Sequence, residues 1–183
     1  MRVHYRHISP QQVFYARGNG PYEPAARDAW RRVNLWLEQH GGRAQVRQAF
    51  GFFRDNPRST EPELLRYDAC VPVSFGLEAD PKAGIGRQML PGGAYAVHAH
   101  VGSYADAGEL LSRLHREIVP TRGLAVDYDR AFLAIYCNDP AITREPHRRT
   151  ELCVPVLPMR MSLAVNDDGE KESAVPAQQG IGW

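Results

Sequence analysis

The sequence predicts an α+β fold made of two copies of one strand-helix-strand-strand unit. In this fold an antiparallel sheet carries two helices on one side and a ligand groove on the other. The prediction depends on an internal repeat: residues 66–73 end in Cys-Val-Pro-Val, and residues 149–156 end in the same four residues. A turn that contains Asp, Asn and Pro precedes each of these two segments. Because self-similarity at a long fixed spacing is typical of two units packed on one another, we expect a pseudo-twofold relation between residues 3–73 and 85–156.

The elements of the first copy follow from local patterns. Residues 3–8 alternate polar and apolar up to a Ser-Pro pair and predict a strand, and residues 13–17 predict a second one. Apolar side chains at helical spacing predict a helix over 24–39, which a Gly-Gly pair ends. Residues 46–54 and 64–73 predict the two remaining strands.

The second copy repeats this order after a linker at residues 78–84. Its predicted elements are strands at 85–90 and 94–101, a helix at 107–119, and strands at 131–137 and 150–156. Residues 159–165 are a candidate for a last strand. The remaining residues, 166–183, are polar without periodicity and predict a tail.

Composition excludes several classes of protein. The chain has 183 residues, of which 43% are hydrophobic, so it can build one domain with a sizeable core. The 22 Lys and Arg balance the 21 Asp and Glu without a long block of like charge, so we expect no direct nucleic-acid binding. Three cysteines without metal-ligand spacing favour a reducing compartment, and we expect a cytoplasmic protein. No apolar run approaches the roughly 20 residues that span a bilayer, so we expect no membrane function.

The period of two along each strand predicts which side chains line the groove. Tyr67 belongs to an apolar set that must lie under the helices, whereas Asp68 points to the opposite face. In the second copy Glu151 has the position of Asp68. We therefore expect both carboxylates in the groove, as countercharges, as an acid and a base, or simply paired with neighbouring arginines. The further groove candidates are Phe53, Ala134 and Tyr136.

His98 and His100 lie two apart on one strand, so their side chains share a face. A metal site would need further ligands at suitable spacing, and the sequence shows none, so we expect no metal. His98 is instead a candidate for lining the pocket. Trp30 and Trp36 have the helical spacing of core residues, with the alternative that one of them reaches the groove.

Several segments carry a resemblance to a known family. They are residues 15–22, the helix with Trp30 and Trp36, and residues 54–57, 65–70, 91–97 and 102–104. These segments resemble the GyrI-like small-molecule-binding domains, which include the effector-binding domains of AraC-type regulators and stand-alone DNA gyrase inhibitory proteins. The resemblance implies one such domain over residues 1–165 and a central pocket that in many members receives cationic aromatic compounds. Members often carry Glu two residues before the Tyr of the strand at 131–137, and Ala134 stands there in this chain.

Three functions compete at this point. The leading hypothesis is a stand-alone protein that binds small aromatic or amphipathic molecules, including cationic ones, without a cofactor. It would act as a sensor, as a sequestering module or as the effector domain of a DNA-binding regulator. The alternatives are a hydrolase of small electrophiles and a protein inhibitor of DNA gyrase. No nucleophile and base can be paired from the sequence, so we assign no catalytic residue.

Overall fold

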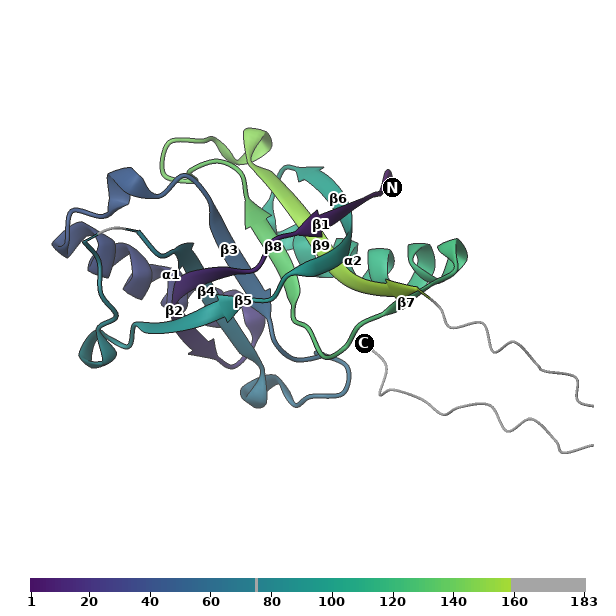
Figure 1. Cartoon of the computed structure of the whole chain (residues 1–183), viewed down its shortest axis with the longest axis horizontal. Helices are drawn as coiled ribbons and strands as arrows, with labels where there is room; N and C mark the ends of the chain where they lie inside the picture. Colours follow the sequence, from purple (N-terminus) through teal and green to yellow (C-terminus); the bar gives the residue numbers. More distant parts are fainter. Residues whose placement is uncertain (75, 159–183) are drawn as a thin grey trace, which may run out of the picture.

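The strands of the chain join into one curled antiparallel sheet (Figure 1). The computed structural model describes residues 1–74 and 76–158. Its strands are β1 (His4–Ile8), β2 (Gln11–Asn19), β3 (Ala49–Phe53), β4 (Arg66–Pro72), β5 (Gly86–Leu90), β6 (Gly93–Val101), β7 (Leu124–Val126), β8 (Phe132–Tyr136) and β9 (Arg149–Pro158). Their order in the sheet is β1-β6-β9-β8-β3-β4-β2-β5, and the short β7 pairs with β9.

Two helices follow β2 and β6. Helix α1 (Tyr22–Gln39) has Pro24 in its first turn. Gly41 follows the end of the helix with a φ of 64°, a left-handed conformation that glycine adopts without strain. The amides of Gly41 and Gly42 return to the carbonyls of Glu38 and Leu37, which satisfies the last turn. Helix α2 (Ala107–Arg113) continues as a π-helical turn (Leu114–Ile118). Single turns of 3-10 helix occupy Arg43–Gln45, Pro62–Leu64, Pro81–Ala83, Tyr104–Asp106, Pro120–Arg122 and Glu145–His147.

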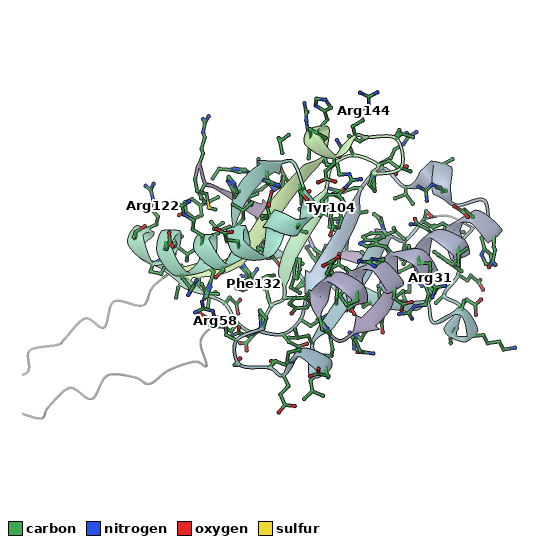
Figure 2. The ribbon with its side chains drawn as sticks, turned by 180° about the vertical axis from the view of Figure 1, so that it is seen from behind. Arg31, Arg58, Tyr104, Arg122, Phe132 and Arg144 are labelled. Atoms are coloured by element: carbon green, nitrogen blue, oxygen red, sulfur yellow. The ribbon has the colours of Figure 1, made fainter. Side chains whose placement is uncertain are left out.

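Both helices cover the same face of the sheet. Figure 2 shows α1 and α2 in front of the sheet, one on each side, with β3 and β8 visible between them. The buried face of α1 packs on β2 and β4 through Ala29, Val33 and Trp36. Leu111 and Leu114 pack on the other half of the same face, against Leu152 and its neighbours. This confirms the expected pair of helices on one side.

The opposite face of the sheet closes on itself, so the expectation of a ligand groove there is wrong. The link from β1 to β2 meets the link from β5 to β6, because Gly92 lies against Pro10 and the carbonyl of Ile8. Curling brings apolar side chains from both halves into one buried cluster: Ile8, Val13, Phe50, Phe52, Cys70, Leu90, Tyr95, Val97, Leu133, Ile135 and Cys153. The curl fills this face with protein, and the large cleft of the described residues lies on the helix side instead.

The two halves of the chain share an order of elements, β2-α1-β3-β4 and β6-α2-β8-β9. Cys70 of β4 pairs with a residue of β3 and one of β2, and Cys153 of β9 pairs likewise with β8 and β6. Superposition of the halves about a twofold axis stays a prediction. The sequence missed β7 and began the strand before residue 54 too early. The candidate strand at 159–165 and the tail at 166–183 lie outside the described residues.

Candidate functional site

The candidate site is a cleft of about 830 Å³ between α1 and α2. Its floor is the helix-side face of the central strands β3, β4 and β8, and its walls are the two helices and the loops that flank them. The floor and walls contain seven rings of phenylalanine, tyrosine and tryptophan: Tyr22, Trp30, Phe53, Tyr67, Tyr104, Phe132 and Tyr136. A mostly apolar concave site of this size is typical of a small-molecule pocket.

A chain of hydrogen bonds orders the centre of the cleft. The indole N–H of Trp30 donates to the hydroxyl of Tyr67 at 3.1 Å, and the hydroxyls of Tyr67 and Tyr136 lie 2.8 Å apart. Two phenols have two hydroxyl hydrogens, and their mutual bond uses one of them. Tyr67 is 1% exposed whereas Tyr136 is half-buried in the cleft, so the second hydrogen is best placed on Tyr136, facing a ligand.

The rings pack edge to face around these hydroxyls. Tyr136 contacts Trp30 at 5.5 Å and Tyr104 at 5.1 Å between ring centroids. Phe53 contacts Tyr22 at 5.1 Å and Tyr67 at 5.4 Å in the same way. Edge-to-face contacts fix ring orientation, so the cleft is preformed rather than collapsed.

Two small residues on the floor make room for this arrangement. Gly51 and Ala134 face each other across β3 and β8. A Cβ on Gly51 would lie 2.2 Å from the hydroxyl oxygen of Tyr67, so only glycine lets Tyr67 reach across β3 to Tyr136. Ala134 is 1% exposed and lines the cleft.

Burial keeps the central phenols neutral. Loss of solvent raises the pKa of Tyr136 to about 12 and raises the pKa of Tyr67 well above its ordinary value. The pKa of Tyr104 is also raised by burial, against the opposing effect of Arg148. These hydroxyls therefore serve as hydrogen-bond donors and acceptors at neutral pH, not as bases.

One end of the cleft carries polar atoms without hydrogen bonds. We call Tyr104, Arg148 and Thr150 the polar end. The buried Tyr104 hydroxyl, Arg148 Nε and Thr150 Oγ1 have no hydrogen-bond partner among the described residues. The guanidinium carbon of Arg148 lies 5.0 Å from the ring centroid of Tyr104. Thr150 pairs with Tyr136 across β8 and β9, which places the polar end next to the central phenols.

The other end of the cleft contains His115, Phe132 and Arg58. His115 is 5% exposed, contacts the ring of Phe132 at 5.6 Å and has its Nε2 3.1 Å from the hydroxyl of Tyr128. Burial, supported by the charges of Arg116 and Arg58, lowers the pKa of His115 to about 4. Figure 2 shows Arg58 and Phe132 near one another, apart from Tyr104. Both ends therefore contain an arginine, and the polar end differs in carrying buried polar atoms without hydrogen bonds among the described residues.

Basic side chains outnumber acidic ones in the lining. The arginines of the lining are Arg27, Arg43, Arg47, Arg58 and Arg148, and its carboxylates are Glu23 and Asp139. Both carboxylates are exposed near the rim and are paired, Glu23 with Arg27 at 2.7 Å and Asp139 with Arg43 at 3.4 Å. The cleft therefore has an excess of positive charge.

Of the sequence candidates, the structure brings Phe53, Ala134 and Tyr136 together in the cleft. The prediction that they share a face with Asp68 and Glu151 is wrong. Phe53 pairs with Tyr67, and Tyr136 pairs with Thr150, so each lies one register position away from the carboxylate. Parity within each strand holds, but the register between strands decides which sets meet, and no local pattern shows it.

Asp68 and Glu151 lie on the opposite face of the sheet. Asp68 is fully buried and accepts hydrogen bonds from Arg17 at 2.7 Å and Arg54 at 2.8 Å. Burial alone would raise the pKa of Asp68, but these hydrogen bonds and charges outweigh it and lower the pKa. Glu151 pairs with Arg6 at 2.6 Å. The carboxylates are ion-paired, as one of the alternatives held, but with arginines far away in sequence.

His98 does not line the cleft, although it shares a face with His100. Its Nδ1 lies 2.9 Å from the carbonyl of Arg2, so the N-terminal segment covers it. His100 lines the cleft instead, with its Nε2 2.9 Å from the carbonyl of Ser103. Of the two tryptophans, Trp36 is 1% exposed in the core and Trp30 reaches the cleft.

Sequence reasoning missed much of the site. The missed lining residues include Tyr22, Tyr67, Tyr104, Arg148 and Thr150, whereas for Trp30 the groove is one of the two predicted alternatives. The signal that could have found several of them is the resemblance itself, since Tyr22, Trp30, Tyr67 and Tyr104 all lie within its motifs. Nothing in the sequence distinguishes Arg148 and Thr150 from ordinary residues at the start of a strand.

The described part of the chain contains neither a metal-ligand cluster nor a membrane-spanning helix. Residues 1–74 and 76–158 contain no group of three or more His, Cys, Asp and Glu side chains that could hold a metal ion. Within the same residues, neither helix has the length and apolarity that a bilayer crossing requires.

Comparison with known proteins identifies the family. Residues 1–157 match the family model of the GyrI-like small molecule binding domain, so the chain belongs to this family. A DNA gyrase inhibitor from Edwardsiella ictaluri (strain 93-146) is 34% identical over 99 residues, which cover 53% of this chain and 62% of that protein. The probable transcriptional regulator YgiV of Escherichia coli (strain K12) is 33% identical over 90 residues, 49% of this chain and 56% of that protein. The chain thus matches less than two thirds of the length of either relative.

Solved structures share the fold at low sequence identity. The EcmrR C-terminal domain superposes with a TM-score of 0.69 at 14% identity, over 86% of this chain and 98% of that one. The protein SAV2435, solved bound to tetraphenylphosphonium, gives a TM-score of 0.56 at 12% identity, over 86% and 94% of the two chains. A hydrolase from Listeria innocua gives 0.56 at 15% identity, over 85% and 92%. These likenesses show that the chain shares the fold of these three proteins.

Proposed function

We propose that the chain binds a small aromatic or amphipathic molecule in the cleft between α1 and α2 and releases it unchanged. The observation that carries the proposal is the set of aromatic rings from both halves of the chain around one cleft of about 830 Å³. Edge-to-face contacts hold these rings in place before a ligand enters, which lowers the entropy cost of binding.

The chemistry of the cleft favours binding over turnover. A hydrolase would need a nucleophile or a base at the ligand, and burial keeps Tyr67 and Tyr136 protonated at neutral pH. Glu23 and Asp139 are paired with arginines near the rim, and Ala134 supplies no carboxylate on the floor. We therefore place hydrolysis of small electrophiles second.

Binding would serve a sensor or a sequestering module. Relatives named as a transcriptional regulator and as a DNA gyrase inhibitor support either a DNA-binding regulator or gyrase as the partner of the loaded protein. A gyrase supercoiling assay with and without the purified chain separates these two partners. Inhibition would favour the gyrase partner, and its absence would favour the regulator.

A filling substitution tests the cleft itself. Ala26 lines the cleft from α1, so Ala26→Trp should occupy ligand space and abolish binding of 2-naphthamide in calorimetry. Leu35→Trp is the matched control, because Leu35 is 47% exposed on the same helix and is not among the residues that line the cleft. Binding that survives Ala26→Trp, or is lost equally in both variants, would overturn the proposal.

An ester panel incubated with the protein should show no product.

A further inference from the structure

We propose that the polar end of the cleft recognises an anionic oxygen group, so that the ligand is an aromatic anion with its rings over Tyr136 and its charge at Arg148 and Thr150. This inference rests on the proposed function and names the class of ligand. It departs from the cationic ligands that the resemblance implies.

Thr150 provides the first argument. Its side chain is 2% exposed, it lines the cleft, and its Oγ1 has no hydrogen-bond partner among the described residues. A buried hydroxyl without a partner destabilises a folded protein, since water has been lost and nothing replaces it. A ligand oxygen at this end would accept a hydrogen bond from the Thr150 hydroxyl, for which the described residues provide no acceptor.

Arg148 provides the second argument. Stacking on Tyr104 holds its guanidinium in place, and its buried Nε makes no hydrogen bond. Arg148 is paired with the carboxylate of Glu145, but the distance from Nη1 to this carboxylate is 3.8 Å, which is too long for a hydrogen bond. The Glu145 side chain is also 57% exposed. A preoriented guanidinium with free donors fits a carboxylate or a phosphate, which can accept two hydrogen bonds from its planar fork. The unpartnered hydroxyl of Tyr104 adds a donor beside it.

The surrounding charges support the same sign of ligand. The carboxylate of Asp139 is paired with Arg43, and a carboxylate oxygen of Asp106 lies 3.6 Å from Nε2 of His100. Each carboxylate therefore has a side-chain partner already. Both are more than two fifths exposed, where solvent screens them. With more arginines than carboxylates in the lining and alanine at position 134, a cation would meet repulsion and an anion attraction.

Four probes with one ring system test the inference by calorimetry. They are 2-naphthoate, 2-naphthyl phosphate, neutral 2-naphthamide and cationic 2-naphthylmethylammonium. We expect at least one anion to bind about tenfold or more tighter than the amide, and the cation to bind weakest, as for a charge-assisted hydrogen bond. The stronger of the two anions identifies a carboxylate or a phosphate as the group bound.

Substitutions at the polar end should remove this preference. Thr150→Val keeps the shape and deletes the hydroxyl, so it should weaken anion binding about tenfold while leaving the melting temperature unchanged or raised. A purely structural hydroxyl would show the opposite, a lower melting temperature with unchanged affinity. Arg148→Gln should bring the affinities for the anion and the amide together. Arg122→Gln is the matched control and should keep them apart, because Arg122 is exposed and is not among the residues that line the cleft.

The outcomes separate this inference from the proposed function. Equal affinities for anion and amide in the native protein, or equal losses in Arg148→Gln and Arg122→Gln, would overturn the anion subsite while the cleft remains a binding site. If none of the four probes binds, the proposed function fails together with it.

Discussion

The hydroxyl oxygens of Tyr67 on β4 and Tyr136 on β8 lie 2.8 Å apart, and they meet over β3, the strand between them. The two residues come from different halves of the chain, so this bond ties the halves together above the sheet. The indole of Trp30 donates to the same Tyr67 oxygen, and α1 is therefore part of the link.

Removing either hydroxyl should have a different effect. Tyr67→Phe leaves the Trp30 N–H without its acceptor and breaks the bond between the phenols, which should cost about 1 to 2 kcal/mol of unfolding free energy. Tyr136→Phe should cost less than about 1 kcal/mol but weaken binding of 2-naphthamide severalfold, because the donor that faces the ligand is gone. Urea unfolding and calorimetry on both variants check the contrast. Identical stability losses would argue against the assigned hydrogen-bond chain.

Gly51→Ala should destabilise the protein through Tyr67. The new Cβ would lie 2.2 Å from the hydroxyl oxygen of Tyr67 and 2.8 Å from the ring carbon that bears it, and this side chain is buried. Forcing a core ring to move costs about 2 kcal/mol. In a Tyr67→Phe background the closest atom is absent, so the same substitution should cost less. A double-mutant cycle in urea measures the difference, and additive effects would contradict this contact.

Asp68→Asn should destabilise the protein without affecting ligand binding. The substitution removes the charge that Arg17 and Arg54 share in a buried site, which should cost about 3 kcal/mol. Since the folded pKa of Asp68 is lowered, its stabilisation is present above the unfolded pKa of about 3.9 and is lost as the pH falls through the folded pKa. The variant should therefore have a flatter acid limb. Asp28→Asn, at an exposed pair, is the control and should cost less than about 1 kcal/mol. If Asp68→Asn also bound 2-naphthamide more weakly, the Asp68 carboxylate would have to be counted as part of the binding site.

His115 should make stability depend on pH in a higher window. The buried ring has a pKa of about 4, whereas an unfolded histidine titrates near 6.5. Protonation therefore favours the unfolded chain, and stability should fall by about 3 kcal/mol as the pH drops from about 6.5 to 4. His115→Phe should flatten this part of the profile, and exposed His147→Gln should leave it unchanged. A native profile that is flat between these values would contradict a neutral, buried His115.

Ala134→Glu should shift the ligand preference toward cations. A carboxylate on the floor would lie among aromatic rings and attract cationic aromatic dyes more strongly, by about 1 to 2 kcal/mol. The same buried charge should lower stability, and the loss should grow as the pH rises above about 4.3, because burial raises the folded pKa of the new side chain. Titration with a cationic dye and a neutral dye of similar shape separates charge recognition from a loosened cleft. Equal changes for both dyes would reject the countercharge at this position.

The local features of this fold could be predicted from the sequence, but most of the way its elements assemble could not. Alternation within β4 correctly placed Tyr67 under the helices and Asp68 on the other face, because side chains alternate along every strand. The relation of Phe53 to these two depends on the register between β3 and β4, which is set by contacts far apart in sequence. The curl that fills the face opposite the helices depends on loops such as the one at Gly92, which meet only in three dimensions.

The site was harder to predict because its polar end is defined by what its atoms do not contact. Thr150 at the start of a strand has no unusual neighbour in the sequence, and its unpartnered hydroxyl becomes visible only when β9 packs beside β8 and under α2. Arg148 likewise becomes distinctive only through its stack on Tyr104.

The facing pair of Gly51 and Ala134 also bears on how this cleft could change in evolution. Ala134 lines the floor of the cleft, whereas Gly51 lies beneath the Tyr67 side chain that forms part of that floor. A single-nucleotide change converts some alanine codons into glutamate codons. One mutational step at position 134 therefore separates a floor without charge from an acidic floor, with the strand order and both helices retained. A single substitution would therefore move this cleft from the proposed anionic ligands toward cationic ones.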